Sequence, residues 1–162
     1  LLADRAGIGI QTLYRYFPNK LSIVATLARQ LISEWESWFT DGDISFSAGD
    51  GIHLFVEMLK NQPGGVAIRH AMAASPALRE LDREDSRRVA EQFAAYVVSL
   101  DDTVDYEDAI VSALVAIEST IAVLDLTYDL PAAEAQRMTE LCVEMQSVFL
   151  SNNFPVLRKA LS

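Results

Sequence analysis

Residues 1–20 read LLADRAGIGIQTLYRYFPNK, a stretch that predicts two short helices separated by a glycine-containing turn. The first helix covers residues 1–6, Gly7 and Gly9 form the turn, and the second helix covers about residues 10–16. This is the arrangement that can lay its second helix in the major groove of DNA. The spacing alone fits an ordinary helical hairpin with a few surface cations equally well, so both interpretations stay open at this point.

The second helix of this pair has a polar outer side and an apolar inner side. Leu13 and Phe17, four residues apart, are expected to anchor it inward. A glutamine amide can pair with a base edge, whereas hydroxyl, guanidinium and ammonium groups suit phosphate oxygens. Lys20 follows at the start of the next helix, where free backbone N–H groups also favour phosphate. The candidate DNA contacts on the helix itself are Gln11, Thr12, Arg15 and Tyr16.

Beyond residue 20, helical periodicity continues and strand alternation is almost absent. Asn19 is a candidate N-cap for a helix over residues 20–39, which precedes a loop over residues 40–51. The apolar face of this helix is formed by Val24, Leu27, Ala28, Leu31, Trp35 and Trp38. Further helices are predicted at about residues 51–61, 66–74, 77–100, 105–127 and from Pro131 to about residue 150, with Pro155 dividing the end. We therefore expect an all-α protein with a head and connecting helix at residues 1–38 and a larger helical domain at residues 39–162.

Composition and charge limit the classes of protein to which the chain can belong. Hydrophobic residues make up 51% of its 162 residues, enough to bury a core. The single cysteine excludes an internal disulfide, no signal peptide is recognisable, and charges interrupt every apolar run, so we expect no membrane span. Residues 1–30 hold four basic residues and one acid, although the whole chain has a net charge of −10. A basic head on an acidic body suggests that only the head meets a polyanion.

The run from Ala109 to Ile117 is apolar except for Ser112. A helix that is apolar all round must be covered on more than one side. The cover is either the chain's own core or a partner subunit, and the pattern does not separate the two.

Little in the sequence indicates catalysis. Two histidines and one cysteine offer few catalytic groups, and no zinc-protease, phosphate-loop or nucleophile-elbow motif occurs. No metal site has ligand spacing, and no cofactor is expected. Cys142 lies on the apolar face of the last long helix, formed with Met138, Leu141, Met145 and Phe149, and is interpreted as a buried packing residue. We expect a protein that is not an enzyme.

The run from Ala6 to Lys20 closely resembles the signature of the tetracycline-repressor (TetR) family. The family pattern is roughly Ala-Gly-Val-Ser-x-x-Thr-Leu-Tyr-x-Tyr-Phe-x-x-Lys, and it closes a helix-turn-helix. The matching positions are Gly7, Thr12, Leu13, Tyr14, Tyr16, Phe17 and Lys20. The resemblance covers only about 20 residues, whereas the remaining helices are compatible with the family without identifying it.

The resemblance implies a bacterial, cytoplasmic, homodimeric transcriptional regulator, in most cases a repressor. Its partners would be double-stranded operator DNA and a small-molecule effector, and the dimer would form through the helices at about residues 105–127 and 131–150. The residues carried over to DNA binding are Gln11, Thr12, Tyr14, Arg15, Tyr16 and Lys20, and for Tyr14 packing is an alternative to a phosphate contact. A helical ligand-binding or interaction module that no longer binds DNA is the alternative.

The sequence also departs from the family pattern. Gly9 replaces the usual helix-capping serine, Ile10 stands where a polar residue is frequent, and Leu21 stands where glutamate is frequent. The family's first helix and the start of its second have no counterpart in the chain. We therefore expect an N-terminally incomplete regulator, which would weaken DNA binding by these 162 residues.

The larger domain is expected to hold an effector pocket lined by aromatic and methionine side chains with a few polar groups. The candidate ligand-binding residues are Trp38, Phe55, Met58, His70, Phe93, Tyr96 and Glu118, with Trp35, Phe39 and Met72 as further apolar wall residues. Plain core packing is the alternative for the aromatic residues. Glu118, in the sequence Glu118-Ser119-Thr120 within an apolar helix, fits a dimer-interface hydrogen bond as well as a ligand contact. An unpaired Glu118 in the pocket would favour a cationic or hydrogen-bond-donating effector.

Overall fold

The computed structural model describes the backbone of residues 2–40 and 48–159 and the side chains of residues 3–34 and 50–158. Every regular element in this part of the chain is a helix, so the predicted all-α fold is confirmed. The helices are α1 (Leu2–Arg5), α2 (Ile10–Tyr16), α3 (Lys20–Thr40), α4 (Ala48–Asn61), α5 (Gly65–Ala74), α6 (Pro76–Leu100), α7 (Tyr106–Thr127), α8 (Ala132–Asn153) and the short 3-10 helix η1 (Pro155–Lys159).

Local signals in the sequence set most of the helix ends. The predicted N-cap of α3 is confirmed, because the Asn19 Oδ1 atom accepts a hydrogen bond of 2.9 Å from the Ser22 N–H group. Asp105 caps α7 in the same way through the Asp108 N–H group at 2.9 Å. Helix α8 ends ahead of Pro155, as predicted. Helix α4 begins three residues before the predicted position, so the end of the expected loop is helical.

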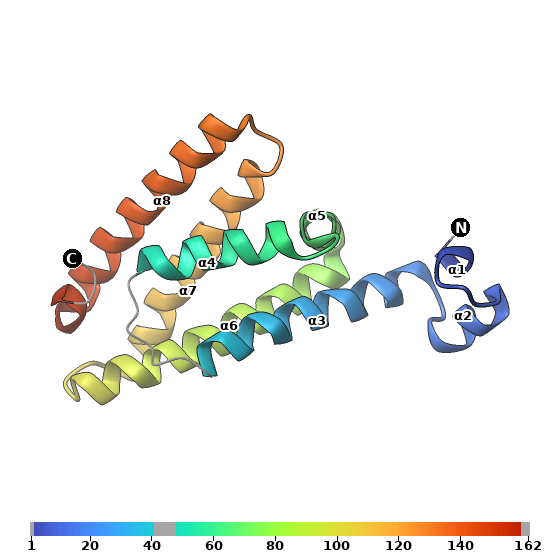
Figure 1. Cartoon of the computed structure of the whole chain (residues 1–162). Helices are drawn as coiled ribbons and strands as arrows, with labels where there is room; N and C mark the ends of the chain where they lie inside the picture. The colour runs from blue at the N-terminus through green and yellow to red at the C-terminus, as the bar shows by residue number, and fades with distance from the viewer. Residues whose placement is uncertain (1, 41–47, 160–162) are drawn as a thin grey trace.

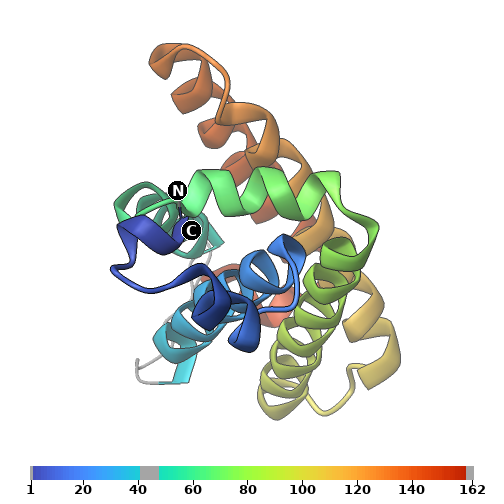
Figure 2. The ribbon, with the colours of Figure 1, turned by 90° about the vertical axis from the view of Figure 1, so that its right-hand side faces the viewer.

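The short helices α1 and α2 stand apart from the other helices at the N-terminal end of α3 (Figure 1). Helix α3 runs from them along the body, where it packs on α5 and α6. Helices α6, α7 and α8 make the most extensive contacts, and the turn end of the α7–α8 hairpin projects beyond the other helices (Figures 1 and 2). The arrangement therefore has a small head, a long connecting helix and a larger body.

Small side chains bring α6 and α7 together. The buried alanines at this interface are Ala90 and Ala94 on α6 and Ala109, Ala113 and Ala116 on α7. Because alanine side chains are short, they allow the two helix axes to approach closely. The apolar run at residues 109–117 is thus covered on one side by the chain's own core. On its outer side, Val111 is 60% exposed and Val115 is 52% exposed.

Helix α7 also qualifies as a membrane span by length and composition alone. Its 22 residues contain an 18-residue window with a mean hydropathy of 2.0, of which 28% is buried within the chain. Charges such as Glu118 interrupt the apolar run, as the sequence analysis noted, but they do not lower the mean hydropathy of the window below this criterion. The core helix of a globular protein can satisfy the same criterion, and α7 packs against both α6 and α8.

A buried ionic cluster joins three helices of the body. Arg69 on α5 is 4% exposed and contacts Asp82 on α6 at 2.7 Å and Asp125 on α7 at 3.1 Å. Burial lowers the pKa of the Arg69 guanidinium, but the hydrogen bond and charge of Asp82, together with Asp125, outweigh this effect and raise the pKa above its usual value. Arg69 therefore remains charged and carries hydrogen bonds between helices far apart in sequence.

Replacing Arg69 with Met should destabilise the fold, because Asp82 and Asp125 would lose their shared partner. We expect a loss of about 2–3 kcal/mol in the free energy of unfolding. Thermal unfolding followed by circular dichroism should then show a midpoint lower by roughly 4–12 °C.

Arg83→Met is the matched control, since Arg83 pairs with Glu80 at 3.6 Å and both side chains are exposed. The control should change stability by less than about 0.5 kcal/mol. Adding Asp125→Asn to Arg69→Met should recover part of the loss. Equal midpoints for the two single variants would show that the ionic cluster does not support the fold.

Candidate functional site

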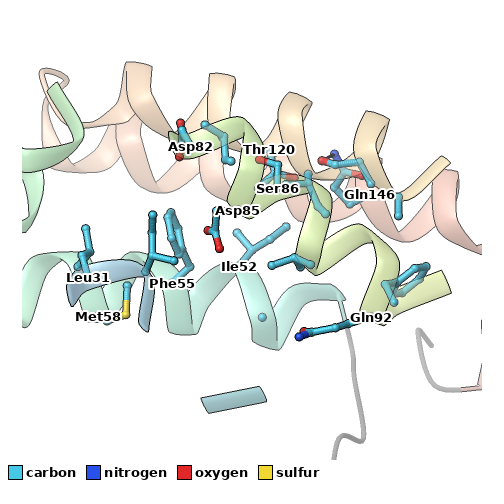
Figure 3. A pocket seen from close by; sticks show the side chains of 18 of the residues that line it. Leu31, Ile52, Phe55, Met58, Asp82, Asp85, Ser86, Gln92, Thr120 and Gln146 are labelled. Atoms are coloured by element: carbon cyan, nitrogen blue, oxygen red, sulfur yellow. Dashed lines mark hydrogen bonds between the residues drawn. The ribbon is translucent and has the colours of Figure 1, made fainter. Parts of the chain in front are cut away.

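A cavity of about 490 Å³ lies among helices α3 to α8. This volume falls within the range of about 300–1,000 Å³ that is typical of small-molecule sites. Its lining is mostly apolar, as Figure 3 shows for many of the side chains. The lining residues are Leu31, Ile32, Gly51, Ile52, Phe55, Met58, Arg69, Met72, Asp82, Asp85, Ser86, Val89, Gln92, Phe93, Tyr96, Ala113, Ala116, Ile117, Thr120, Ile121, Gln146 and Leu150.

Four of the seven candidate ligand-binding residues line this cavity. Phe55 and Met58 reach it from α4, and Phe93 and Tyr96 reach it from α6. Each pair is spaced three residues apart, so its members share one face of their helix. The predicted contact at Trp38 lies outside the described side chains, as do the wall positions at Trp35 and Phe39.

The two polar candidates, His70 and Glu118, are not among the lining residues. The His70 side chain is 44% exposed and lies 3.8 Å from Asp129, with its ring 5.8 Å from that of Tyr128. Glu118 is exposed on α7. It shares the outer face of that helix with Val115, because residues three apart are neighbours on a helix surface.

The polar groups that do line the cavity were largely missed by the sequence analysis. They are Arg69, Asp82, Asp85, Ser86, Gln92, Thr120 and Gln146. Thr120 could have been chosen over Glu118 by continuing the helical series from Ala113 through Ala116 and Ile117, since all four lie on one face. Asp82 and Asp85 had no such signal, because in sequence α6 is an ordinary charged helix, and nothing in the sequence of α5 marks Arg69 as buried.

The inward face of α8 differs from the predicted apolar stripe. Its buried residues are Thr139, Cys142, Gln146 and Leu150. Leu141 and Met145 are both 46% exposed, so these two members of the predicted stripe point outward. The sequence analysis had assigned residues of the inward face and of the outward face to a single apolar stripe. Cys142 is buried, as predicted.

Gln146 is held in a defined orientation at the cavity wall. Its Nε2 atom donates hydrogen bonds to the Ala116 carbonyl oxygen at 3.1 Å and to the Ser119 hydroxyl at 2.8 Å. A backbone carbonyl only accepts hydrogen bonds, which fixes the amide nitrogen on that side. The Oε1 atom is buried and receives no hydrogen bond from the described residues.

The six candidate DNA-binding residues are all exposed in the head. The exposed fractions are 48% for Tyr14 and 65% for Tyr16. Arg15 donates a hydrogen bond of 3.1 Å to the Tyr16 hydroxyl, and its guanidinium lies 5.1 Å from the centre of the Tyr16 ring. Gly9 precedes α2 without a side-chain cap, as expected from the missing serine. The head therefore presents a cationic and hydroxyl-bearing surface.

Residues 46–153 match the family described as the C-terminal domain of tetracycline-repressor-like proteins. The chain belongs to the TetR family. The matched region contains α4 to α8 and most of the cavity lining, and in this family the C-terminal domain is associated with ligand binding and dimerisation. TetR-like domains belong to regulators.

Residues 1–45 of this TetR family member, with α1 to α3, lie outside the match. The assignment of the head therefore rests on its own sequence signature. No curated relative matches the chain. Among the described residues, no group of three or more histidine, cysteine, aspartate or glutamate side chains is arranged to hold a metal ion.

Cys142 should react slowly with thiol reagents in the folded protein. Burial raises the pKa of its thiol, and the Thr120 hydroxyl 3.9 Å away offsets this effect only in part. A raised pKa leaves less thiolate at pH 8, and the thiolate is the reactive form. Reaction with Ellman's reagent, followed by absorbance, should be at least about tenfold slower than in urea-unfolded protein. Equal rates in the two states would contradict the buried, protonated thiol.

Proposed function

We propose that this TetR family member is a dimeric transcriptional repressor that a small molecule in the α3–α8 cavity releases from its operator DNA. Residues 1–38 would form the DNA-binding head and connecting helix, and residues 39–162 the ligand-binding and dimerisation domain. The observation that carries the proposal is the mostly apolar cavity of about 490 Å³ with several polar groups, most of whose lining lies inside the region that matches the family.

Helix α3 supports a connection between the cavity and the head. It begins at Lys20, a candidate phosphate contact, and its residues Leu31 and Ile32 line the cavity. Lys20 and Leu31 are about 17 Å apart along one continuous helix. A ligand that moves Leu31 or Ile32 would therefore also move the head, without any intervening loop to absorb the change.

The surface of the head supports DNA as its partner. Tyr16 and Lys20 offer a hydroxyl and an ammonium to phosphate oxygens, while Gln11 and Thr12 would approach base edges. Two heads related by a two-fold axis would read half-sites about 34–36 Å apart on a near-palindromic operator.

The outer face of the α7–α8 hairpin supports dimerisation. Its exposed apolar residues are Val111, Val115 and Leu126 on α7 and Leu141, Met145 and Val148 on α8. If these residues form one apolar surface, it is of the kind that is typical of protein–protein interfaces. Glu118 lies in the same exposed stripe of α7, which favours the interface role for this residue over a ligand contact.

Ligand and DNA would act on each other through the dimer. If the ligand favours a head spacing that does not fit the operator, it weakens DNA binding by some factor. By linkage, operator DNA must then weaken ligand binding by the same factor.

The DNA-binding proposal is tested on the full-length protein by fluorescence anisotropy with labelled duplex DNA from the region upstream of its own gene. Binding should weaken steeply as salt rises, because the protein releases counterions from the phosphates. The double variant Tyr16→Phe, Lys20→Ala should bind about tenfold more weakly and reduce the salt slope by about 1.

Lys60→Ala is the matched control, since Lys60 is an exposed lysine of the body. It should leave both affinity and salt slope unchanged. Binding no tighter than to unrelated DNA, or equal loss in the two variants, would favour a ligand-binding module without DNA recognition.

The dimer proposal predicts that Leu141→Glu separates the subunits. Burying a carboxylate in an apolar interface is costly, so the dimer dissociation constant should rise at least about 100-fold. Sedimentation equilibrium measures this constant directly. Leu54→Glu is the control, because Leu54 on α4 is 44% exposed, nearly the same as Leu141 at 46%. A monomeric parent protein, or equal effects of the two variants, would contradict the α7–α8 interface.

A further inference from the structure

The cavity has two chemically different walls. Its apolar wall comes from α3 and α4, where Leu31, Ile52, Phe55 and Met58 line it (Figure 3). The opposite wall, from α6, α7 and α8, is apolar at positions such as Phe93 and Ile117, but it also carries the polar side chains, which include Ser86, Thr120 and Gln146. A ligand that fills this space must therefore have an apolar body and polar groups along one side or end.

The charged groups around the cavity favour a cation over an anion. Arg69 is already shared by Asp82 and Asp125, so its charge is more than neutralised. The other carboxylate of the lining belongs to Asp85, whose side chain is 14% exposed and extends from α6 toward α4 (Figure 3).

Arg88 binds Asp85 at 3.1 Å, but the Arg88 side chain is 49% exposed, so solvent screens its charge. These ion pairs contain three carboxylates, of Asp82, Asp85 and Asp125, and two guanidiniums, of Arg69 and Arg88. In the Asp85–Arg88 pair, the guanidinium is more exposed to solvent than the carboxylate. Among the described lining residues, the one guanidinium is that of Arg69, which two carboxylates already share, so an anionic ligand would meet net negative charge there.

The unpaired oxygen of Gln146 favours a hydrogen-bond donor independently of these charges. This side chain is 3% exposed, its Nε2 atom is committed to Ala116 and Ser119, and none of the described residues donates a hydrogen bond to its Oε1 atom. A buried acceptor without a partner costs free energy that a donor can recover. The charges near Asp85 and the Gln146 oxygen thus both favour a ligand that donates hydrogen bonds.

We propose that the cavity binds a lipophilic amine, with its protonated nitrogen at the Asp85 carboxylate and its apolar body against α3 and α4. The Gln146 carbonyl oxygen then accepts a hydrogen bond from a second N–H or O–H group, where the ligand carries one. The inference rests on the proposed ligand-binding role and adds the chemical class of the ligand. Pairing with a carboxylate offsets the cost of taking an ammonium out of water.

Three probes with the same ten-carbon chain test the class: decylamine, decanol and decanoate. At pH 7 the amine is protonated and the acid is ionised. Isothermal titration calorimetry, below the concentrations at which the probes self-associate, should show decylamine binding at least about tenfold more tightly than decanol, and decanoate more weakly than both.

Asp85→Asn separates charge from shape, because asparagine has nearly the same size and can still accept a hydrogen bond from Arg88. The variant should bind decanol as the parent does and lose most of the preference for decylamine. Asp129→Asn is the matched control, since Asp129 is 82% exposed and does not line the cavity. Circular dichroism should show that both variants keep the parent's helical content.

The outcomes distinguish this inference from the proposed function. Decanol binding without preference for decylamine, tighter binding of decanoate, or an unchanged preference in Asp85→Asn would overturn the amine class and leave the ligand-binding role standing. Failure of all three probes to bind would overturn both.

Discussion

The body depends on one interaction, the sharing of Arg69 between Asp82 and Asp125. A guanidinium at 4% exposure would be strongly unfavourable alone, so α5 can occupy its place only when α6 and α7 bring their carboxylates to it. Asp82 and Asp125 are 43 positions apart in the chain, and no local propensity brings them together. The cluster fixes the relative placement of three helices at one end of the cavity, where Arg69 and Asp82 form part of its wall.

The cavity exists because the helices beside it pack in two different ways. Helices α6 and α7 meet through alanines, whereas larger residues such as Ile52 and Leu124 pack between α4, α7 and α8. Close packing on one side and wide packing on the other leave a space that the neighbouring side chains do not fill. In the proposed function, the ligand fills this space and the second subunit packs on the outer face of α7.

Sequence patterns predicted the helices well because caps and breaks act locally. Asn19 and Asp105 fixed helix starts through hydrogen bonds to residues three positions on, and Pro155, which has no backbone N–H group, follows the end of α8. The site was harder to predict. Periodicity finds apolar faces, so it found Phe55, Met58, Phe93 and Tyr96.

Periodicity does not indicate which helix packs on a given face. For that reason, residues of the inward and outward faces of α8 were assigned to a single apolar stripe. It also gives no signal for Arg69 or Gln146, because their partners come from helices that are distant in sequence.

The length of helix α3 has a mechanical consequence. Ala28 is fully buried where α3 packs against α5 and α6, and it divides the helix unequally. Ile32 at the cavity is about 6 Å from Ala28, and Lys20 is about 12 Å from it on the other side. If α3 rocks about Ala28 as a rigid rod, a displacement of about 1 Å at Ile32 becomes about 2 Å at Lys20, and a two-fold axis doubles this to about 4 Å between heads. In the proposed dimer on its operator, such a change would exceed the tolerance of a hydrogen bond to phosphate, so a slight swelling of the cavity would be sufficient to put the two heads out of register with one DNA duplex.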